Sequence, residues 1–402
     1  MLMEYIRIGA KVKIGSEAKS RVGLVPAVAA IVGIALAAAA CGSSKSTAAG
    51  SSATSSAGAE AKLGTAYNVT TATDVTLAGA GANSIDPFFQ RVFYDYHAKN
   101  PKTTVTYSPA GSSVGIKDIQ QNTVDFGDSE IPMSATDLTK ATAGTVLQLP
   151  VDLGGVAVSY DLPGVSGGLN LDGPTLAAIF DGSITRWNDP QIAAVSGKTN
   201  LPDLPIVAVH RADSSGPGWD LDAYLIKTSP EWVTKIGTTK PSKTWPLTDV
   251  GIGQQLNTGV ANYIHQTPGA IGFVEYGYAL QAGFTDAALK NQSGSFVAPS
   301  LASIGAAGGQ AKNLSASNFN VIDEPGAGSY PLTNFSWTLL YQKQSNEAKG
   351  LALGKLFDYV TTTGQADAAL LGYAPLPPAA TALAQSTLLD LQNASGSPLF
   401  SS

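Results

Sequence analysis

Apolar and polar residues alternate along this chain in short runs, and each run is followed by apolar residues at helical spacing. Alternation at every second residue predicts a half-buried strand, whereas recurrence at every third or fourth residue predicts an amphipathic helix. The helical spacing is clearest at Phe88, Phe89, Val92, Phe93 and Tyr96. The strand-like runs are residues 75–78, 104–107, 146–149, 156–158 and 206–209. Strands that alternate with helices indicate an α/β fold, with sites at the carboxyl ends of strands.

The rest of the pattern adds shorter elements. Apolar spacing predicts helices at 176–180, 191–195, 351–360 and 380–391. The Trp-Asn-Asp-Pro sequence at 187–190 predicts a turn between the first two of these helices. Residues 287–315 are mostly small and polar, and their periodicity is weak. This segment is therefore expected to be a surface excursion.

Three Gly/Ser-rich turns, at residues 79–84, 111–115 and 210–217, each lead into a predicted helix. The first turn of a helix leaves backbone N–H groups without partners, and the helix dipole makes that end positive. Several such ends converging on one point, together with hydroxyl groups and Arg211, would bind a small dehydrated oxyanion. This arrangement predicts a binding function that needs no catalytic group.

The charge of the chain narrows the range of partners. Residues 1–40 carry a net charge of +3, so removing them changes the formal charge from −6 to −9. An acidic protein lacks the basic surface that nucleic-acid binding needs. The three histidines show no metal-ligand spacing, so neither a metal site nor a cofactor is predicted.

The N-terminal part predicts export and a lipid anchor. Residues 22–40 are apolar, follow a basic stretch and end at Cys41, the only cysteine. A membrane span or a buried free cysteine would be the alternatives, but small residues before Cys41 resemble a bacterial lipoprotein cleavage site. We therefore expect a signal peptide at 1–40, lipidation of Cys41 and a Ser/Ala/Gly-rich tether at 41–66. The folded part then has no cysteine for a disulfide.

Six segments, in order along residues 74–380, resemble the phosphate-binding lipoproteins of bacterial ABC importers. They lie at 79–82, 110–113, 122–127, 171–176, 211–216 and 268–276. The resemblance implies a two-lobed periplasmic-binding-protein fold of type II, with two chain crossings and a ligand cleft between the lobes. The expected limits are 67–155 plus 325–402 for lobe 1, and 156–324 for lobe 2.

The same resemblance implies a function and a set of ligand-binding residues. The chain would be a monomeric receptor on the outer face of the cytoplasmic membrane, capturing inorganic phosphate for a permease, without catalysis. Asp213 would hold Arg211 in place. The family's ligand positions fall on Asn83, Ser84, Ser112, Glu130, Arg211, Ser215, Gly216 and Pro217.

Three of these positions depart from the family pattern. Asn83 and Pro217 replace threonines, and Pro217 removes a hydroxyl and a backbone donor while suiting the first turn of a helix. Glu130 replaces an aspartate. An ionised carboxylate only accepts hydrogen bonds, so it favours an oxyanion that carries a proton, such as phosphate, over sulfate. To accommodate the longer side chain of Glu130, the local backbone would withdraw, the cavity would shrink, or Asp128 would take over the role of this carboxylate.

Two other functions remain open from the sequence. The scaffold could be retuned to another oxyanion, because three of its ligand positions differ. Residues 111–115 also fit G-x-S-x-G, the nucleophile elbow of esterases, with Ser113 as nucleophile. An esterase needs a histidine after this serine, and only His210 and His265 follow it. Ester hydrolysis that depends on Ser113 would favour the enzyme.

Overall fold

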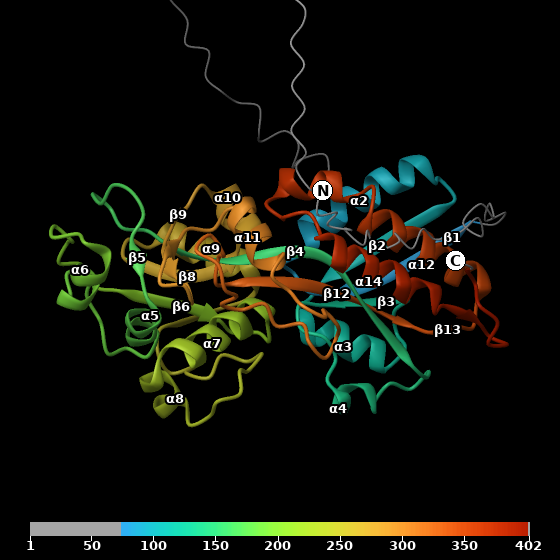
Figure 1. Cartoon of the computed structure of the whole chain (residues 1–402), viewed down its shortest axis with the longest axis horizontal. Helices are drawn as coiled ribbons and strands as arrows, with labels where there is room; N and C mark the ends of the chain where they lie inside the picture. The colour runs from blue at the N-terminus through green and yellow to red at the C-terminus, as the bar shows by residue number, and fades with distance from the viewer. Residues whose placement is uncertain (1–73, 401–402) are drawn as a thin grey trace, which may run out of the picture. The chain divides into compact units, whose positions relative to one another are not determined.

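The computed structural model describes residues 74–400, which belong to one compact unit, Gly58–Ser402. The signal peptide, Cys41 and the tether predicted from the sequence lie outside the described residues. Within residues 74–400, no helix has the length and apolar character needed to cross a membrane. The described residues form two lobes of strands and helices, and long strands join the lobes (Figure 1).

A nine-stranded mixed sheet runs through both lobes, in the order β2-β1-β3-β12-β4-β8-β6-β7, with β9 beside β4. Its members are β1 (Val75–Gly81), β2 (Thr103–Pro109), β3 (Phe126–Ser129), β4 (Val146–Tyr160), β6 (Val207–Arg211), β7 (Ile252–Gln254), β8 (Ala270–Glu275), β9 (Thr285–Asp286) and β12 (Thr333–Tyr341). Short strands complete the set: β5 (Asn170–Leu171), β10 (Ala288–Lys290), β11 (Phe296–Val297), β13 (Lys343–Gln344) and β14 (Gln392–Asn393).

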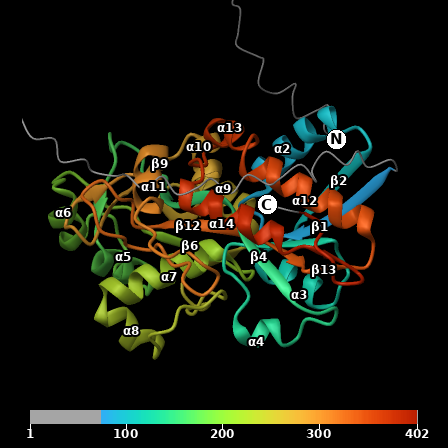
Figure 2. The same cartoon turned by 45° about the vertical axis from the view of Figure 1, so that its right-hand side comes forward.

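Helices cover the sheet in both lobes, and Figure 2 shows α12 and α14 side by side, where they also contact each other. The helices of the N- and C-terminal segments are α2 (Asp86–Lys99), α3 (Ser112–Gln120), α4 (Ala135–Leu138), α12 (Glu347–Thr361), α13 (Gln365–Ala368), η3 (Ala369–Leu371) and α14 (Pro378–Leu389). Those of the middle segment are α5 (Gly173–Phe180), α6 (Pro190–Ser196), α7 (Gly216–Thr228), α8 (Pro230–Ile236), α9 (Leu256–Gln266), α10 (Tyr276–Ala282) and α11 (Leu301–Gly308).

Two long strands connect the lobes. Residues 146–155 of β4 pair with β12, whereas Val156–Tyr160 of the same strand pair with β8. Strand β12 also pairs with β3, so β4 and β12 together join the two parts of the sheet (Figure 1). We call residues 74–155 and 325–400 lobe 1, and residues 156–324 lobe 2. These are the limits predicted from the sequence, restricted to the described residues.

The prediction of separate strands at 146–149 and 156–158 is wrong, because β4 is one continuous strand from Val146 to Tyr160. Pro150 and the glycine pair at 154–155 mimic a strand break in the sequence. In the structure Pro150 lies opposite Trp337, at a β-bulge where the register with β12 shifts. A bulge accommodates a proline that cannot donate a ladder hydrogen bond.

The segment 287–315 is also not the surface excursion that its composition predicted. It contains β10, β11 and α11, and the side chains of Leu289 and Ile304 are fully buried. Ile304 of α11 lies directly against Gly155 of β4. Small residues allow this helix to approach the sheet closely, and isolated large apolar residues anchor it. Because these large apolar residues are few, the sequence of this segment shows little helical periodicity.

Candidate functional site

The three Gly/Ser-rich turns follow β1, β2 and β6, and the structure brings them to one place where the lobes meet. Strands β1, β2 and β3 are parallel, so their carboxyl ends lie at one edge of the sheet. Helix α3 begins after β2 and α7 begins after β6, and the two helices face each other across the lobe boundary (Figures 1 and 2). The hydroxyls of Ser113 and Ser214 are 2.6 Å apart across this boundary.

Glu130, the residue after β3, lies at the centre of this place and is 4% exposed. Its Oε2 accepts a hydrogen bond of 3.1 Å from the Ser112 hydroxyl and one of 3.0 Å from the Gly216 N–H. Ser112 is the first residue of α3 and Gly216 the first of α7. One carboxylate oxygen therefore binds two helix N-termini that belong to different lobes.

Two glycines make this approach possible. A Cβ on Gly216 would lie 2.2 Å from Oε2 of Glu130, so no other residue fits while the carboxylate is there. Gly81 ends β1 with a φ of +149°, and a Cβ there would lie 2.0 Å from the Asp128 carbonyl oxygen. The first turn can therefore pack directly on the end of β3.

Arg211, the last residue of β6, is 2% exposed and is held by Asp213. Its Nε donates to Oδ1 of Asp213 at 2.8 Å, and its Nη2 donates to Oδ2 of the same carboxylate. Asp213 also accepts from the Leu256 N–H at 3.0 Å. Burial tends to raise the pKa of Asp213, but these bonds and the Arg211 charge bring it below its ordinary value. The pair fixes the guanidinium beside the two helix N-termini.

The two serines that open the helices have different roles. Ser215 is the N-cap of α7, and its hydroxyl accepts from the Gly218 N–H at 3.1 Å. Ser112 makes no cap, because Gly111 occupies the N-cap position of α3 and the Ser112 hydroxyl binds Glu130. Pro217 lies in the first turn of α7, where a missing N–H is tolerated.

Asn83 and Ser84 complete the set predicted from the sequence. Oδ1 of Asn83 accepts from the Asn257 N–H at 3.0 Å, so this side chain joins the lobes. The Ser84 hydroxyl is buried without a hydrogen-bond partner, as is Oε1 of Glu130. Burial raises the pKa of Glu130, and the Ser84 hydroxyl and the Arg211 charge limit the increase. The Ser84 hydroxyl therefore lies near the Glu130 carboxylate, on which the charge of Arg211 also acts.

The Asp128 carboxylate binds β12 and not the two helix N-termini. Its carboxylate accepts from the Ser336 hydroxyl at 3.1 Å and the Thr338 hydroxyl at 3.3 Å, both on β12. The three alternatives from the sequence stay predictions; the observed contact is that Glu130 extends across to the Gly216 N–H of lobe 2. The backbone of Glu130 stays near α3, because its N–H donates to the Ser112 hydroxyl at 3.4 Å.

Buried carboxylates surround Glu130. Asp220 accepts from the Asn334 amide at 2.6 Å, and Glu275 accepts from the Gly155 N–H at 2.8 Å. Burial raises the pKa of both groups well above their ordinary values, and the charge of Glu130 adds to the effect. Asp152 accepts from the Ser336 N–H at 3.0 Å, and burial raises its pKa to about 7. The floor of the site therefore favours protonated carboxyl groups near neutral pH.

This environment makes stability depend on pH. Because the pKa of Asp152 rises from 3.8 to about 7 on folding, its stabilising effect is complete below the lower value and is lost as pH rises through the higher one. At about 1.4 kcal/mol per pH unit, the loss is on the order of 4 kcal/mol. We expect the free energy of unfolding, measured with urea, to fall between about pH 4 and about pH 7.

The Asp152→Asn variant should flatten that profile, because the amide oxygen still accepts from Ser336 but no proton is exchanged. The exposed Asp390→Asn variant is the matched control and should keep the wild-type slope. An Asp152→Asn profile as steep as that of the wild type would show that this carboxyl does not set the pH dependence.

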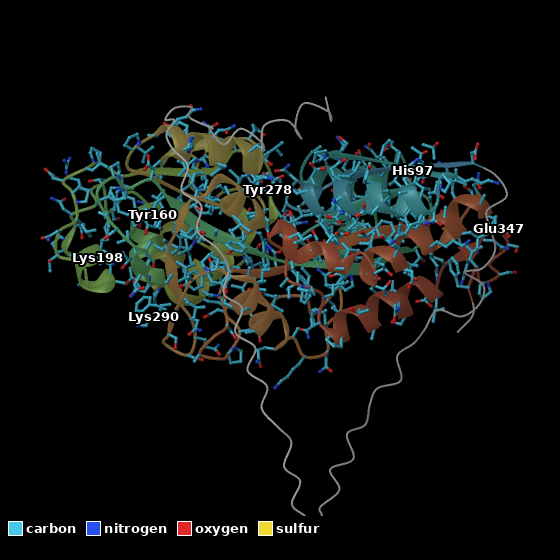
Figure 3. All side chains as sticks on the ribbon, turned by 90° about the horizontal axis from the view of Figure 1, so that it is seen from above. His97, Tyr160, Lys198, Tyr278, Lys290 and Glu347 are labelled. Carbon is cyan, nitrogen blue, oxygen red and sulfur yellow. The ribbon has the colours of Figure 1, made fainter. Side chains whose placement is uncertain are left out.

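The sequence did not identify several residues that contact the site. The Tyr278 hydroxyl donates to the Asn83 carbonyl oxygen at 2.9 Å, and Figure 3 shows this tyrosine where the lobes meet. Asn257 binds Asn83 with its N–H, and its Oδ1 accepts from the Glu275 N–H at 3.0 Å. Glu275 lies in the 268–276 segment that carried the resemblance, and Tyr278 lies two residues after it. That resemblance was the sequence signal that could have identified them.

The serine of the G-x-S-x-G sequence has a different neighbour from the one an esterase requires. The Ser113 hydroxyl pairs with Ser214, and Nδ1 of His210 lies 3.0 Å from the Arg211 carbonyl oxygen. The ring of His210 stacks on Trp245 at 6.0 Å, and that of His265 lies near Phe284. Among the described residues, neither histidine hydrogen-bonds to the Ser113 hydroxyl.

Residues 41–362 match the profile of the PBP superfamily domain. A phosphate-binding protein PstS of Xylella fastidiosa is 38% identical over 307 residues, or 76% of this chain and 82% of that protein. One from Pasteurella multocida is 38% identical over 305 residues, covering 75% and 86% of the two chains. The phosphate-binding protein PstS 2 of Mycobacterium tuberculosis is 29% identical over 327 residues, covering 78% and 86%.

Solved structures show the same two-lobed fold. A high-affinity periplasmic phosphate-binding protein with bound phosphate aligns with a TM-score of 0.62 and 20% identity, over 78% of this chain and 98% of that chain. A phosphate-binding protein of Stenotrophomonas maltophilia aligns with a TM-score of 0.59 and 18% identity, over 78% and 93%. At these identities the likeness establishes the type II fold.

Proposed function

Because this chain belongs to the phosphate-binding protein family of the PBP superfamily, we propose that it captures inorganic phosphate between its lobes and delivers it to an ABC importer. One observation carries the proposal most directly. Arg211 and the N-termini of α3 and α7 meet at a buried point between the lobes, around a carboxylate oxygen that accepts from both helices.

Each group there has a role in binding an anion. The Gly216 N–H and the Ser112 and Ser84 hydroxyls would replace water around the phosphate oxygens, with the helix N-termini adding favourable potential. Arg211, oriented by Asp213, would add a charge-assisted hydrogen bond. Ser215 and Asn83 support the site by capping α7 and by joining the lobes.

Selectivity would come from Glu130. Once displaced from Ser112 and Gly216, its carboxylate would remain beside the anion and accept the proton of a hydrogen phosphate ion. Sulfate has no such proton at neutral pH, so it would face an acceptor without a donor. Arsenate carries the same proton as phosphate. The alternative is a site that prefers another oxyanion because of Asn83 and Pro217. Comparing the binding of phosphate, arsenate and sulfate distinguishes the two.

The N-terminal sequence supports a proposal for where the receptor is located. We propose export through residues 1–40, lipidation at Cys41 and a tether at 41–66 that keeps a monomeric receptor near its permease. Binding and release would involve no bond making or breaking. The lobes would move about β4 and β12, the strands that join them.

Thermal unfolding of the purified full-length protein, stripped of bound anions, tests this function. A ligand that binds only the folded state at one hundred times its Kd stabilises by about 2.7 kcal/mol, so phosphate and arsenate should each raise Tm by several degrees. Equal stabilisation by sulfate would instead support the retuned site.

The same preparation tests the esterase. We expect no hydrolysis of a chromogenic ester above that of the Ser113→Ala variant. Hydrolysis that disappears in Ser113→Ala, without any shift by oxyanions, would contradict the receptor.

A further inference from the structure

The position of Glu130 has a consequence for how the receptor handles its ligand. Oε2 of Glu130 is bound by the Ser112 hydroxyl and the Gly216 N–H, which are donors of the proposed phosphate site. We propose that Glu130 is a tethered competitor for the anion: without phosphate, its carboxylate takes these donors and holds the lobes together. The inference rests on the proposed function and identifies a residue that sets affinity.

The length of the Glu130 side chain determines which donors its carboxylate contacts. The hydrogen bond from the Gly216 N–H to Glu130 measures 3.0 Å, and one methylene accounts for about 1.5 Å of reach. An aspartate at this position would hold its oxygens one methylene closer to a backbone that lies near Ser112, so it would not keep the present contact of Oε2 with the Gly216 N–H. In this chain the longer carboxylate contacts both lobes.

The Glu130 carboxylate also lies where an anion would be most favoured. Helices α3 and α7 have nine and thirteen residues. In α7, Pro217 has no N–H and Ser215 caps the Gly218 N–H, so the Gly216 N–H is the donor that faces Glu130. A carboxylate oxygen offers the same charge and lone pairs as a phosphate oxygen. The Ser84 hydroxyl, 3% exposed and without a partner, is a further donor near the same carboxylate.

The Glu130 side chain also fills the space beside Gly216. A Cβ on this residue would lie 2.2 Å from Oε2 and 2.3 Å from both Cβ and Cδ of Glu130. The glutamate side chain therefore packs against the start of α7 along its length. An anion that binds the Gly216 N–H must displace this side chain, because both cannot occupy the same space.

Competition by an attached group lowers the apparent affinity. A tethered group acts at an effective concentration of about millimolar or more, so free phosphate must exceed that competition before it binds. The apparent Kd then equals the intrinsic Kd divided by the fraction of molecules in which Glu130 has left the donors. Shortening the side chain removes the competitor while keeping a carboxylate beside the anion.

Three variants of the full-length protein test the inference. Glu130→Asp should bind phosphate at least ~10-fold more tightly than the wild type in titration calorimetry. Glu130→Gln keeps the length and an acceptor oxygen, so it should still hold the lobes together. Glu347→Asp makes the same change at an exposed glutamate far from the site, labelled in Figure 3, and should match the wild type.

Hydrogen exchange of the Gly216 amide, measured without phosphate, gives a second readout. The amide should be protected in the wild type and in Glu130→Gln, and exchange at least ~10-fold faster in Glu130→Asp until phosphate is added. Equal exchange and equal or weaker phosphate binding in Glu130→Asp would overturn the inference. If no variant binds phosphate, the proposed function fails, and the exchange rates alone still decide whether Glu130 holds α7.

Discussion

Replacing Arg211 by alanine is expected to weaken phosphate binding by ~10- to ~150-fold, the largest effect of any side chain in the site. A charge-assisted hydrogen bond contributes about 1.5–3 kcal/mol, and each 1.4 kcal/mol corresponds to a factor of about ten in Kd. Arg211 is 2% exposed, so solvent does not screen its interaction with a buried anion. Titration calorimetry with phosphate measures the loss.

The chain offers a matched control for this variant. Arg186 also pairs with an aspartate, Asp203, but its side chain is 47% exposed and the pair lies outside the site. Arg186→Ala should bind phosphate as the wild type does. Arg211→Lys keeps the charge and loses the planar fork, so it should lie between alanine and wild type. Binding by Arg211→Ala within threefold of the wild type would remove Arg211 from the site.

Replacing Gly216 by alanine is expected to reduce phosphate binding about as much. The added methyl group would occupy the space at the start of α7 where Oε2 of Glu130 now lies, 2.2 Å from the new Cβ. Crowding of this kind costs about 1–3 kcal/mol, so both the contact with Glu130 and an anion in its place should be lost. We expect a rise in Kd of about 100-fold, or 2.7 kcal/mol.

Gly305→Ala is the control for an added methyl group. The new Cβ would lie 4.0 Å from Ala374, on helix α11, so it should leave binding unchanged and stabilise the helix by about 0.5–1 kcal/mol. The double variant Glu130→Ala with Gly216→Ala should remain weak, since the methyl group itself blocks the anion. Recovery of binding in the double variant would show instead that Gly216 acts only through Glu130.

Local patterns predicted the elements that build the site. Alternation located β1 and β2, and helical spacing located α2, because those residues form independent local units. Glycine and serine at three turns predicted helix N-termini at strand ends, and the structure places Glu130, Arg211 and the starts of α3 and α7 together. Parallel pairing brings the ends of β1, β2 and β3 to one edge of the sheet. The approach of Arg211 and α7 from lobe 2 depends instead on the strands that join the lobes.

Other features depend on contacts that no local pattern encodes. Asn334 binds Asp220 across 114 positions of sequence, and the Ser336 hydroxyl binds Asp128 across 208. The extra methylene of Glu130 was visible in the sequence, but its direction across the lobe boundary depends on where Gly216 lies. The continuous β4 was missed because Pro150 looks like a strand end until the bulge opposite Trp337 is seen.

Titration calorimetry of the stripped full-length protein with phosphate and sulfate, at several pH values, tests the central claim most directly. The account predicts saturable phosphate binding with one anion per chain and no sulfate heat at neutral pH, because Glu130 accepts a proton that only phosphate brings. Sulfate competing as well as phosphate would mean that Glu130 does not face the ligand. Absence of binding by either anion would contradict the phosphate-receptor function.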